Sequence, residues 1–226
     1  MNKSIYKIGI ASSVTITFIF ILWIVCFTGI ALTSPLFRWT NLNDYLIFEQ
    51  NNNQFFQYLA KTAMFLFGPF YVIFIHSFYA LSEGETKNST RLSLLFALAF
   101  ALLSCIHYFV QLSAVRMNIM KGQTNGLELY LQANPYSIMT AVNMLGWTVF
   151  LGLSSLFMVP FFRKNNKILR ITFMVNGISC LLGAVGYLFE IDILTFLTVN
   201  LMLGGAVLTQ SVISIFWFKR KMISQQ

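Results

Sequence analysis

Long stretches without a charged residue constrain this chain more than any other feature of its sequence. Six intervals carry no Asp, Glu, Lys or Arg and are mainly apolar: 8–37, 62–82, 92–115, 129–162, 171–189 and 193–218. A helix that crosses the hydrocarbon core of a bilayer needs about 20 consecutive apolar residues. Each interval is therefore about long enough to cross, and the sequence predicts an all-α integral membrane protein with a bundle of six transmembrane helices.

Turn-forming residues trim these intervals to six predicted spans within a single transmembrane domain, residues 1–226. The predicted spans lie near 8–32, 55–81, 92–115, 137–161, 171–189 and 193–217. Lys3 and Lys7 precede the first apolar run, as in a secretory signal. The apolar region of a signal has only about 7–15 residues, and this run is about twice as long. We therefore expect a retained first helix.

Composition supports a membrane protein and disfavours a soluble one. Hydrophobic residues make up 57% of the chain and charged residues only 10%, whereas roughly 25% of residues are charged in soluble domains. The 24 Phe residues would be hard to bury in a soluble core of 226 residues. The net charge of +8 does not indicate nucleic-acid binding, because no basic stripe with interleaved aromatic residues is present.

Lys and Arg predict the orientation, because cytoplasmic loops are enriched in them. With a cytoplasmic N-terminus, eleven of the fifteen basic residues fall in cytoplasmic segments and four on the opposite side. The eleven are Lys3, Lys7, Lys87, Arg91, Arg163, Lys164, Lys167, Arg170, Lys219, Arg220 and Lys221, and the four are Arg38, Lys61, Arg116 and Lys121. We therefore expect a multi-pass protein of the plasma (inner) membrane, with both termini in the cytoplasm and the lipid bilayer as its first partner.

The two longer outer loops are each predicted to hold a short helix. In residues 33–54, Trp39, Leu42 and Tyr45 recur at helical spacing, which is typical of a helix lying on the membrane surface. In residues 116–136, Asn125 followed by Glu128 resembles a capping box at a helix start. Two interpretations stay open for both loops: anchoring at the interface, or a lid over an outward-facing cavity.

Polar residues inside the spans are the candidate functional residues, because such residues are costly in a bilayer. We expect a ligand-binding pocket in the outer halves of helices two to six, lined by Lys61, His107, Gln111, Asn143, Trp147 and Asn200, with Arg116, Glu128, Glu190 and Asp192 around its mouth. The alternative is that Lys61 reaches the interface, the other charged side chains lie in water, and the amides pair between helices.

The second histidine of the chain is predicted to be structural. His76 lies in the inner half of the second span, and Asn176 and Gln210 also lie toward that side. We expect a hydrogen bond between helices there. The spans hold no carboxylate at depth, which argues against a proton-coupled pump.

Known catalytic and cofactor signatures are absent from the sequence. There is no HExxH, no Gly-rich phosphate loop, no GxSxG and no EF-hand. The three cysteines, Cys26, Cys105 and Cys180, are far apart and inside apolar stretches, so they indicate neither a metal site nor a disulfide framework. We therefore expect no metal and no cofactor, and no catalytic residue is assigned.

Three functional hypotheses follow, and the sequence does not choose among them. The first is binding or transport of a small apolar or amphiphilic molecule through the outward-facing pocket. The second is an intramembrane enzyme that acts on a lipid-like substrate, with His107 as its acid–base group. The third is an accessory protein that acts through membrane-protein partners, with Ser179 and Gly183, or Gly204 and Gly205, at helix contacts.

Overall fold

The computed structural model describes residues 3–164 and 166–224, and it is built of helices and the segments that join them. The elements in chain order are α1 (Lys3–Thr33), α2 (Leu42–Asn51), α3 (Phe55–Leu81), α4 (Thr86–Val110), η1 (Gln111–Val115), α5 (Arg116–Met120), η2 (Leu127–Leu129), α6 (Ile138–Met144), η3 (Leu145–Phe150), α7 (Leu151–Met158), η4 (Val159–Phe162), α8 (Lys167–Leu188), α9 (Asp192–Thr195), η5 (Phe196–Met202) and α10 (Leu203–Ile223).

Six helical stretches of the described chain are long and apolar enough to cross a membrane, which confirms the predicted helical class and the number of candidate spans. They are Lys3–Thr33, Phe55–Leu81, Thr86–Met120, Ile138–Phe162, Lys167–Leu188 and Asp192–Ile223. Several extend beyond the predicted bounds. The third stretch has 35 residues, which corresponds to about 52 Å against a hydrocarbon core of about 30 Å.

These longer helices differ from the prediction because charged residues ended the predicted spans. A charge ends the part of a helix that can lie in lipid, but backbone hydrogen bonds continue through it. The third stretch accordingly begins before Lys87 and Arg91 and continues past Arg116.

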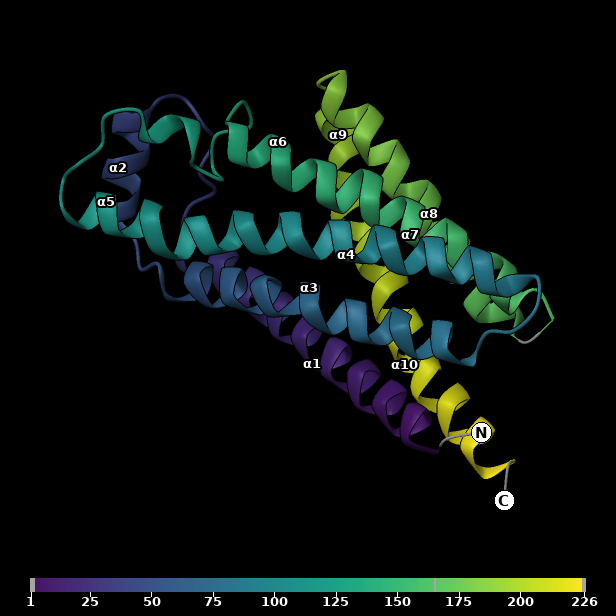
Figure 1. Ribbon diagram of the computed structural model, residues 1–226. Helices are drawn as coiled ribbons and strands as arrows, with labels where there is room; N and C mark the ends of the chain where they lie inside the picture. The colour runs from purple at the N-terminus through teal and green to yellow at the C-terminus, as the bar shows by residue number, and fades with distance from the viewer. Residues whose placement is uncertain (1–2, 165, 225–226) are drawn as a thin grey trace.

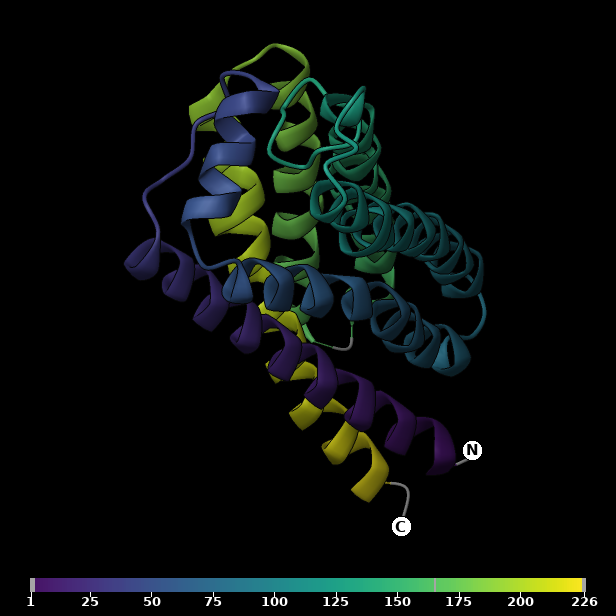
Figure 2. The ribbon, with the colours of Figure 1, turned by 90° about the vertical axis from the view of Figure 1, so that its left-hand side faces the viewer.

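Both ends of the described chain lie at one end of the bundle. α1 and α10 pack side by side there and diverge toward the opposite end (Figures 1 and 2). We call these the terminus end and the cap end. The cap consists of α2 and residues 121–137, which lie over the ends of the long helices (Figure 1).

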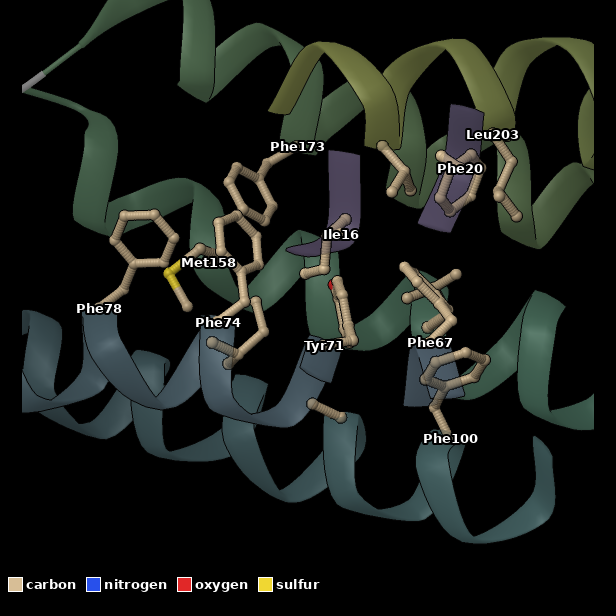
Figure 3. Close-up of a cluster of buried hydrophobic side chains, with 14 of the residues drawn as sticks. Ile16, Phe20, Phe67, Tyr71, Phe74, Phe78, Phe100, Met158, Phe173 and Leu203 are labelled. Carbon is tan, nitrogen blue, oxygen red and sulfur yellow. The ribbon is translucent and has the colours of Figure 1, made fainter. Parts of the chain in front are cut away.

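Aromatic rings fill the centre of the bundle. Phe67 on α3 contacts Phe100 on α4 with ring centroids 5.8 Å apart, and Phe78 stacks on Phe218 of α10 at 4.8 Å. Figure 3 shows this core, with Phe74, Phe78 and Phe173 toward one end and Phe20, Phe67 and Phe100 toward the other. The rings are almost entirely buried, so the middle of the bundle is closed by packed side chains.

Neutral side chains join neighbouring helices by hydrogen bonds. Asn176 Nδ2 on α8 donates to Ser155 Oγ on α7 at 2.8 Å, and Ser93 Oγ on α4 donates to the Ser154 carbonyl at 2.7 Å. Gln210 Nε2 on α10 donates to the Thr172 carbonyl of α8 at 3.0 Å. Such bonds help to hold helices together where lipid supplies no hydrophobic force between them.

Within the described residues, His76 makes no hydrogen bond with Asn176 or Gln210, so this expectation was wrong. His76 is exposed on α3, while Asn176 pairs with Ser155 and the Gln210 amide donates to α8. The physical reason is rotation about the helix axis: α3 turns Ile75 and Phe78, rather than His76, toward the core. Depth along a span does not determine which face a residue occupies.

Small residues bring α7 and α8 into close contact. A Cβ atom built on Gly177 would lie 2.5 Å from Leu156 Cγ and 3.0 Å from the Gly152 carbonyl oxygen. Gly183 has a similar role, because its Cβ would lie 2.7 Å from Val199 in η5. At Gly205, by contrast, a Cβ would meet no atom of the described chain within 4 Å, so this glycine makes no helix contact there.

The cap has an apolar cluster of its own. Tyr45 of α2, Val115 of η1 and Leu127 and Leu131 of the second loop are buried together. The Tyr45 hydroxyl donates to the Glu49 carboxylate. Burial, and then the nearby Glu49 charge, raise the pKa of Tyr45, so its hydroxyl stays protonated as a donor. Asn41 starts α2 by accepting a hydrogen bond from the Asp44 N–H at 2.9 Å.

Candidate ligand-binding pocket

A half-open pocket lies at the cap end, where α1 and α10 diverge. Its volume is about 170 Å³. It is lined by Phe20, Trp23, Met64, Tyr108, Gln132, Asn143, Met144, Trp147, Val199, Asn200, Leu203 and Gly204. These residues come from five of the six candidate spans and from the cap, and none of them is Asp, Glu, Lys, Arg or His. The pocket is therefore uncharged.

Aromatic rings form the walls of the pocket and the floor toward the core. Trp147 stacks on Phe67 with ring centroids 5.4 Å apart and planes 8° from parallel, and it meets Phe100 edge to face at 4.9 Å. Phe20 lies beside Leu203 on the other side (Figure 3). Because Phe67 and Phe100 are fully buried, the pocket is closed toward the terminus end.

Two polar atoms of the pocket lining have no protein partner. Trp147 is 7% exposed, yet its Nε1 makes no hydrogen bond within the described residues, and the same holds for Asn143 Oδ1. The Tyr108 hydroxyl lies close to both side chains, but neither atom reaches hydrogen-bond geometry with any group the structure describes. Leaving buried polar groups unpaired is unfavourable by about 1–3 kcal/mol each, so these atoms favour a bound polar partner.

A single glutamine positions the loop segment 130–132, which we call the roof of the pocket because its Gln132 lines the pocket. Gln111 is buried at the junction of α4 and η1, where its Nε2 donates to the Tyr130 carbonyl and its Oε1 accepts from the Gln132 N–H at 3.1 Å. Both ends of the Gln111 amide thus bind loop backbone. These two hydrogen bonds, which we call the Gln111 clamp, hold Gln132 over the pocket. The Gln132 Oε1 has no hydrogen-bond partner in the described part of the chain.

Segments of π-helix surround the pocket. η3 contains Trp147, and its wide turn is marked by the bond from the Leu151 N–H to the Gly146 carbonyl. η5 contains Asn200, with a similar bond from the Leu203 N–H to the Thr198 carbonyl. π-helical turns are rare and occur frequently at functional sites. Their position in two of the pocket walls supports this pocket as the candidate site.

His107 makes a structural contact behind the pocket. Its Nδ1 lies 2.9 Å from the Met139 carbonyl, and because a carbonyl only accepts, Nδ1 carries the proton. Nε2 is then an acceptor that lies near Gln132 and has no hydrogen-bond partner among the residues described. His107 is not part of the pocket lining, so the acid–base hypothesis receives no support from the geometry of the pocket.

The charged candidates lie elsewhere at the cap end. Lys61 is half-buried, with its Nζ 5.2 Å from the centre of the Tyr58 ring. Arg116 is exposed and its Nε donates to the Leu112 carbonyl at 3.2 Å. Glu190 and Asp192 are exposed at the turn between α8 and α9, and Glu128 is half-buried in the second loop. None of these five lines the pocket as far as the structure describes the chain.

The structure thus brings together three of the predicted residues and adds others. Asn143, Trp147 and Asn200 share the pocket. Sequence reasoning did not single out Tyr108, which adjoins His107 in the third span. It also missed the wall from α1, since Phe20 and Trp23 resemble any other apolar residue of a span. The role of the predicted site in binding stays a prediction.

No group of three or more His, Cys, Asp or Glu side chains in the described residues could hold a metal ion. Comparison with protein-family models, with curated proteins and with solved structures finds no match to this chain.

Proposed function

We propose that this chain is an integral membrane protein that binds a small neutral amphiphilic molecule in the pocket at its cap end. The observation that carries the proposal is the combination of an uncharged aromatic lining with the unpaired Trp147 Nε1 and Asn143 Oδ1. Ligand sites are typically apolar pockets with a few convergent polar groups. Two neutral polar atoms in an aromatic pocket match that description.

The volume limits the size of the bound group. An engineered cavity of about 150 Å³ holds one benzene molecule, so about 170 Å³ accommodates a single ring with one or two polar atoms. A longer molecule would place only its head in the pocket. Its remainder would extend out of the open side of the pocket.

Binding is better supported than passage through the bundle. The buried rings of Phe67, Tyr71 and Phe100 lie between the pocket and the terminus end. Transport would require these rings to move. We therefore propose binding as the basic activity, and transport only as a further step driven by some other component.

The orientation of the protein is part of the proposal. We propose that the protein lies in the plasma membrane, with the terminus end in the cytoplasm and the pocket in the opposite half of the bilayer. The basic residues support this, because eleven of the fifteen lie in segments at the terminus end.

Native mass spectrometry of the gently purified protein tests binding with a matched pair of glycine variants. Gly204 lines the pocket, and a Cβ there would lie 3.9 Å from Phe20. Gly204→Leu should fill the pocket and abolish any bound small molecule. Gly205→Leu changes the adjacent, exposed residue and should retain it, because the side chain points away from the pocket.

Two results would contradict the proposal. One is a wild-type protein that carries no small molecule and gains none when membrane extract is added. The other is the same bound species in wild type, Gly204→Leu and Gly205→Leu, which would indicate lipid on the outer surface of the bundle.

A further inference from the structure

We infer that the molecule bound in this pocket carries a phenol-like head: a single ring with one hydroxyl group and no charge. This inference rests on the proposed binding function and specifies its ligand class. It follows from the hydrogen-bond types of the unpaired atoms, the lining rings and the absence of charged residues from the lining.

The two unpaired atoms have opposite hydrogen-bonding character. The Trp147 indole can only donate, and Asn143 Oδ1 can only accept. A ketone or ether oxygen would satisfy Trp147 and leave Asn143 unpaired, whereas an ammonium group would do the reverse. A hydroxyl group both accepts and donates, so one ligand atom can pair with both residues.

The Tyr108 hydroxyl supports a shared polar position. It lies close to both the Asn143 and the Trp147 side chains, so the polar groups converge on one part of the pocket rather than being spread around it. Gln132 Oε1, on the roof, offers another unpaired acceptor. A single hydroxyl on the ligand is therefore sufficient, and a second would still find an acceptor.

The rest of the lining suits a flat ring. Phe20, Trp23 and Trp147 contribute ring surfaces to the pocket, and aromatic groups pack favourably in stacked or edge-to-face arrangements. Phe67 and Phe100 support Trp147 from behind, which holds its indole in place. A ligand ring of benzene size also matches the volume of about 170 Å³.

The lining disfavours a charged ligand. It contains no Lys or Arg to pair with a carboxylate, and no Asp or Glu to pair with an amine. Transfer of an unpaired charge into such a site is far more costly than transfer of a neutral hydroxyl.

Three probes of similar size test the inference on the purified full-length protein by isothermal titration calorimetry. They are p-cresol, toluene, which lacks only the hydroxyl, and benzoate, which carries a charge. We expect saturable binding of p-cresol about tenfold tighter than that of toluene, the ratio expected for two added hydrogen bonds at the weaker end of their usual range, one to Trp147 and one to Asn143. Benzoate should show no saturable binding.

A tryptophan pair serves as the matched control. Trp147→Phe removes the indole N–H from the pocket and should reduce the preference for p-cresol over toluene to about threefold, because the hydrogen bond to Asn143 remains, while toluene still binds. Trp217 is also 7% exposed, and its Nε1 likewise has no partner among described residues, but it lies in the core near Phe218 rather than in the pocket. Trp217→Phe should keep the wild-type preference.

The outcomes separate the two proposals. If none of the probes binds wild type saturably, the proposed binding function itself fails. If toluene binds as tightly as p-cresol, or benzoate binds more tightly than either, the pocket stands and the phenol-like class is overturned. If Trp147→Phe does not fold, Asn143→Leu replaces it, and an unchanged p-cresol preference in that variant overturns the inference.

Discussion

Gln111 shows how one buried amide can organise a loop. Its carbonyl oxygen and its NH₂ group both bind backbone of the segment that covers the pocket. A residue that the sequence marked as a ligand contact thus serves the pocket indirectly. The distinction is physical: both ends of the buried Gln111 amide already bind loop backbone, whereas Asn143 Oδ1 is still unpaired within the described chain.

Substitution of Gln111 should therefore loosen the roof. Gln111→Leu keeps a side chain of similar volume but leaves the Tyr130 carbonyl and the Gln132 N–H without this partner, at an expected cost of about 2 kcal/mol. Hydrogen exchange of residues 127–133 should become at least tenfold faster. Ser113→Ala is the control, because that hydroxyl donates to the Phe109 carbonyl of the same helical stretch and contacts no loop backbone among the hydrogen bonds of the described residues. Unchanged exchange in Gln111→Leu would show that the clamp is unimportant.

At the scale of elements, the close contact between two helices and the wide π-helical turns lie in different parts of the bundle. α7 and α8 meet through Gly152 and Gly177 below the pocket, and this contact is tight. η3 and η5 flank the pocket with wide π turns. The stretch Ile138–Phe162 thus combines a tight crossing at α7 with an irregular pocket wall at η3.

The crossing predicts opposite effects of alanine at two glycines. Gly177→Ala places a methyl group 2.5 Å from Leu156 Cγ and 3.0 Å from the Gly152 carbonyl oxygen, so α7 and α8 must separate, at a cost of about 1–3 kcal/mol. Gly205→Ala meets no described atom within 4 Å and should be neutral or stabilising by up to about 1 kcal/mol, since Ala favours helix. Thermal unfolding in detergent measures both, and equal midpoints would contradict the predicted contact.

At the scale of the whole molecule, charge is confined to the two ends. The terminus end holds the basic clusters around residues 163–170 and 219–221, while buried side chains between the ends are neutral. This distribution follows from the bilayer, since an unpaired charge at its centre is costly. It also makes the two ends chemically different, with the basic end suited to anionic headgroups.

The charge distribution predicts which end is accessible from outside the cell. Gln123 is exposed in the cap-end loop, and Glu83 is exposed in the loop between α3 and α4 at the terminus end. Each is replaced in turn by cysteine, as Gln123→Cys and Glu83→Cys. A membrane-impermeant maleimide should label Gln123→Cys in intact cells, and Glu83→Cys only after permeabilisation. The native cysteines serve as the background, measured in the unmodified chain. The reverse labelling pattern would invert the proposed orientation.

The sequence by itself determined the fold class, the six candidate spans and the neutral character of the interior. The physical reason is that lipid demands about 20 apolar residues per crossing and satisfied backbone hydrogen bonds, and both demands can be read locally. The predicted span 55–81 even matches α3 at both ends. Several helices extend beyond the predicted spans and include charged residues, because a charge ends a predicted span but does not end a helix.

Only the tertiary structure decided which polar residues share a site. Asn143, Trp147 and Asn200 meet Tyr108 and the α1 wall because of the rotation of each helix and the divergence of α1 from α10. Those rotations turned His76 outward and committed Gln111 to the loop backbone. Which face of a helix turns toward the interior is set by packing among helices far apart in sequence. Hydrophobic periodicity does not predict it here, because these helices are apolar on nearly every face.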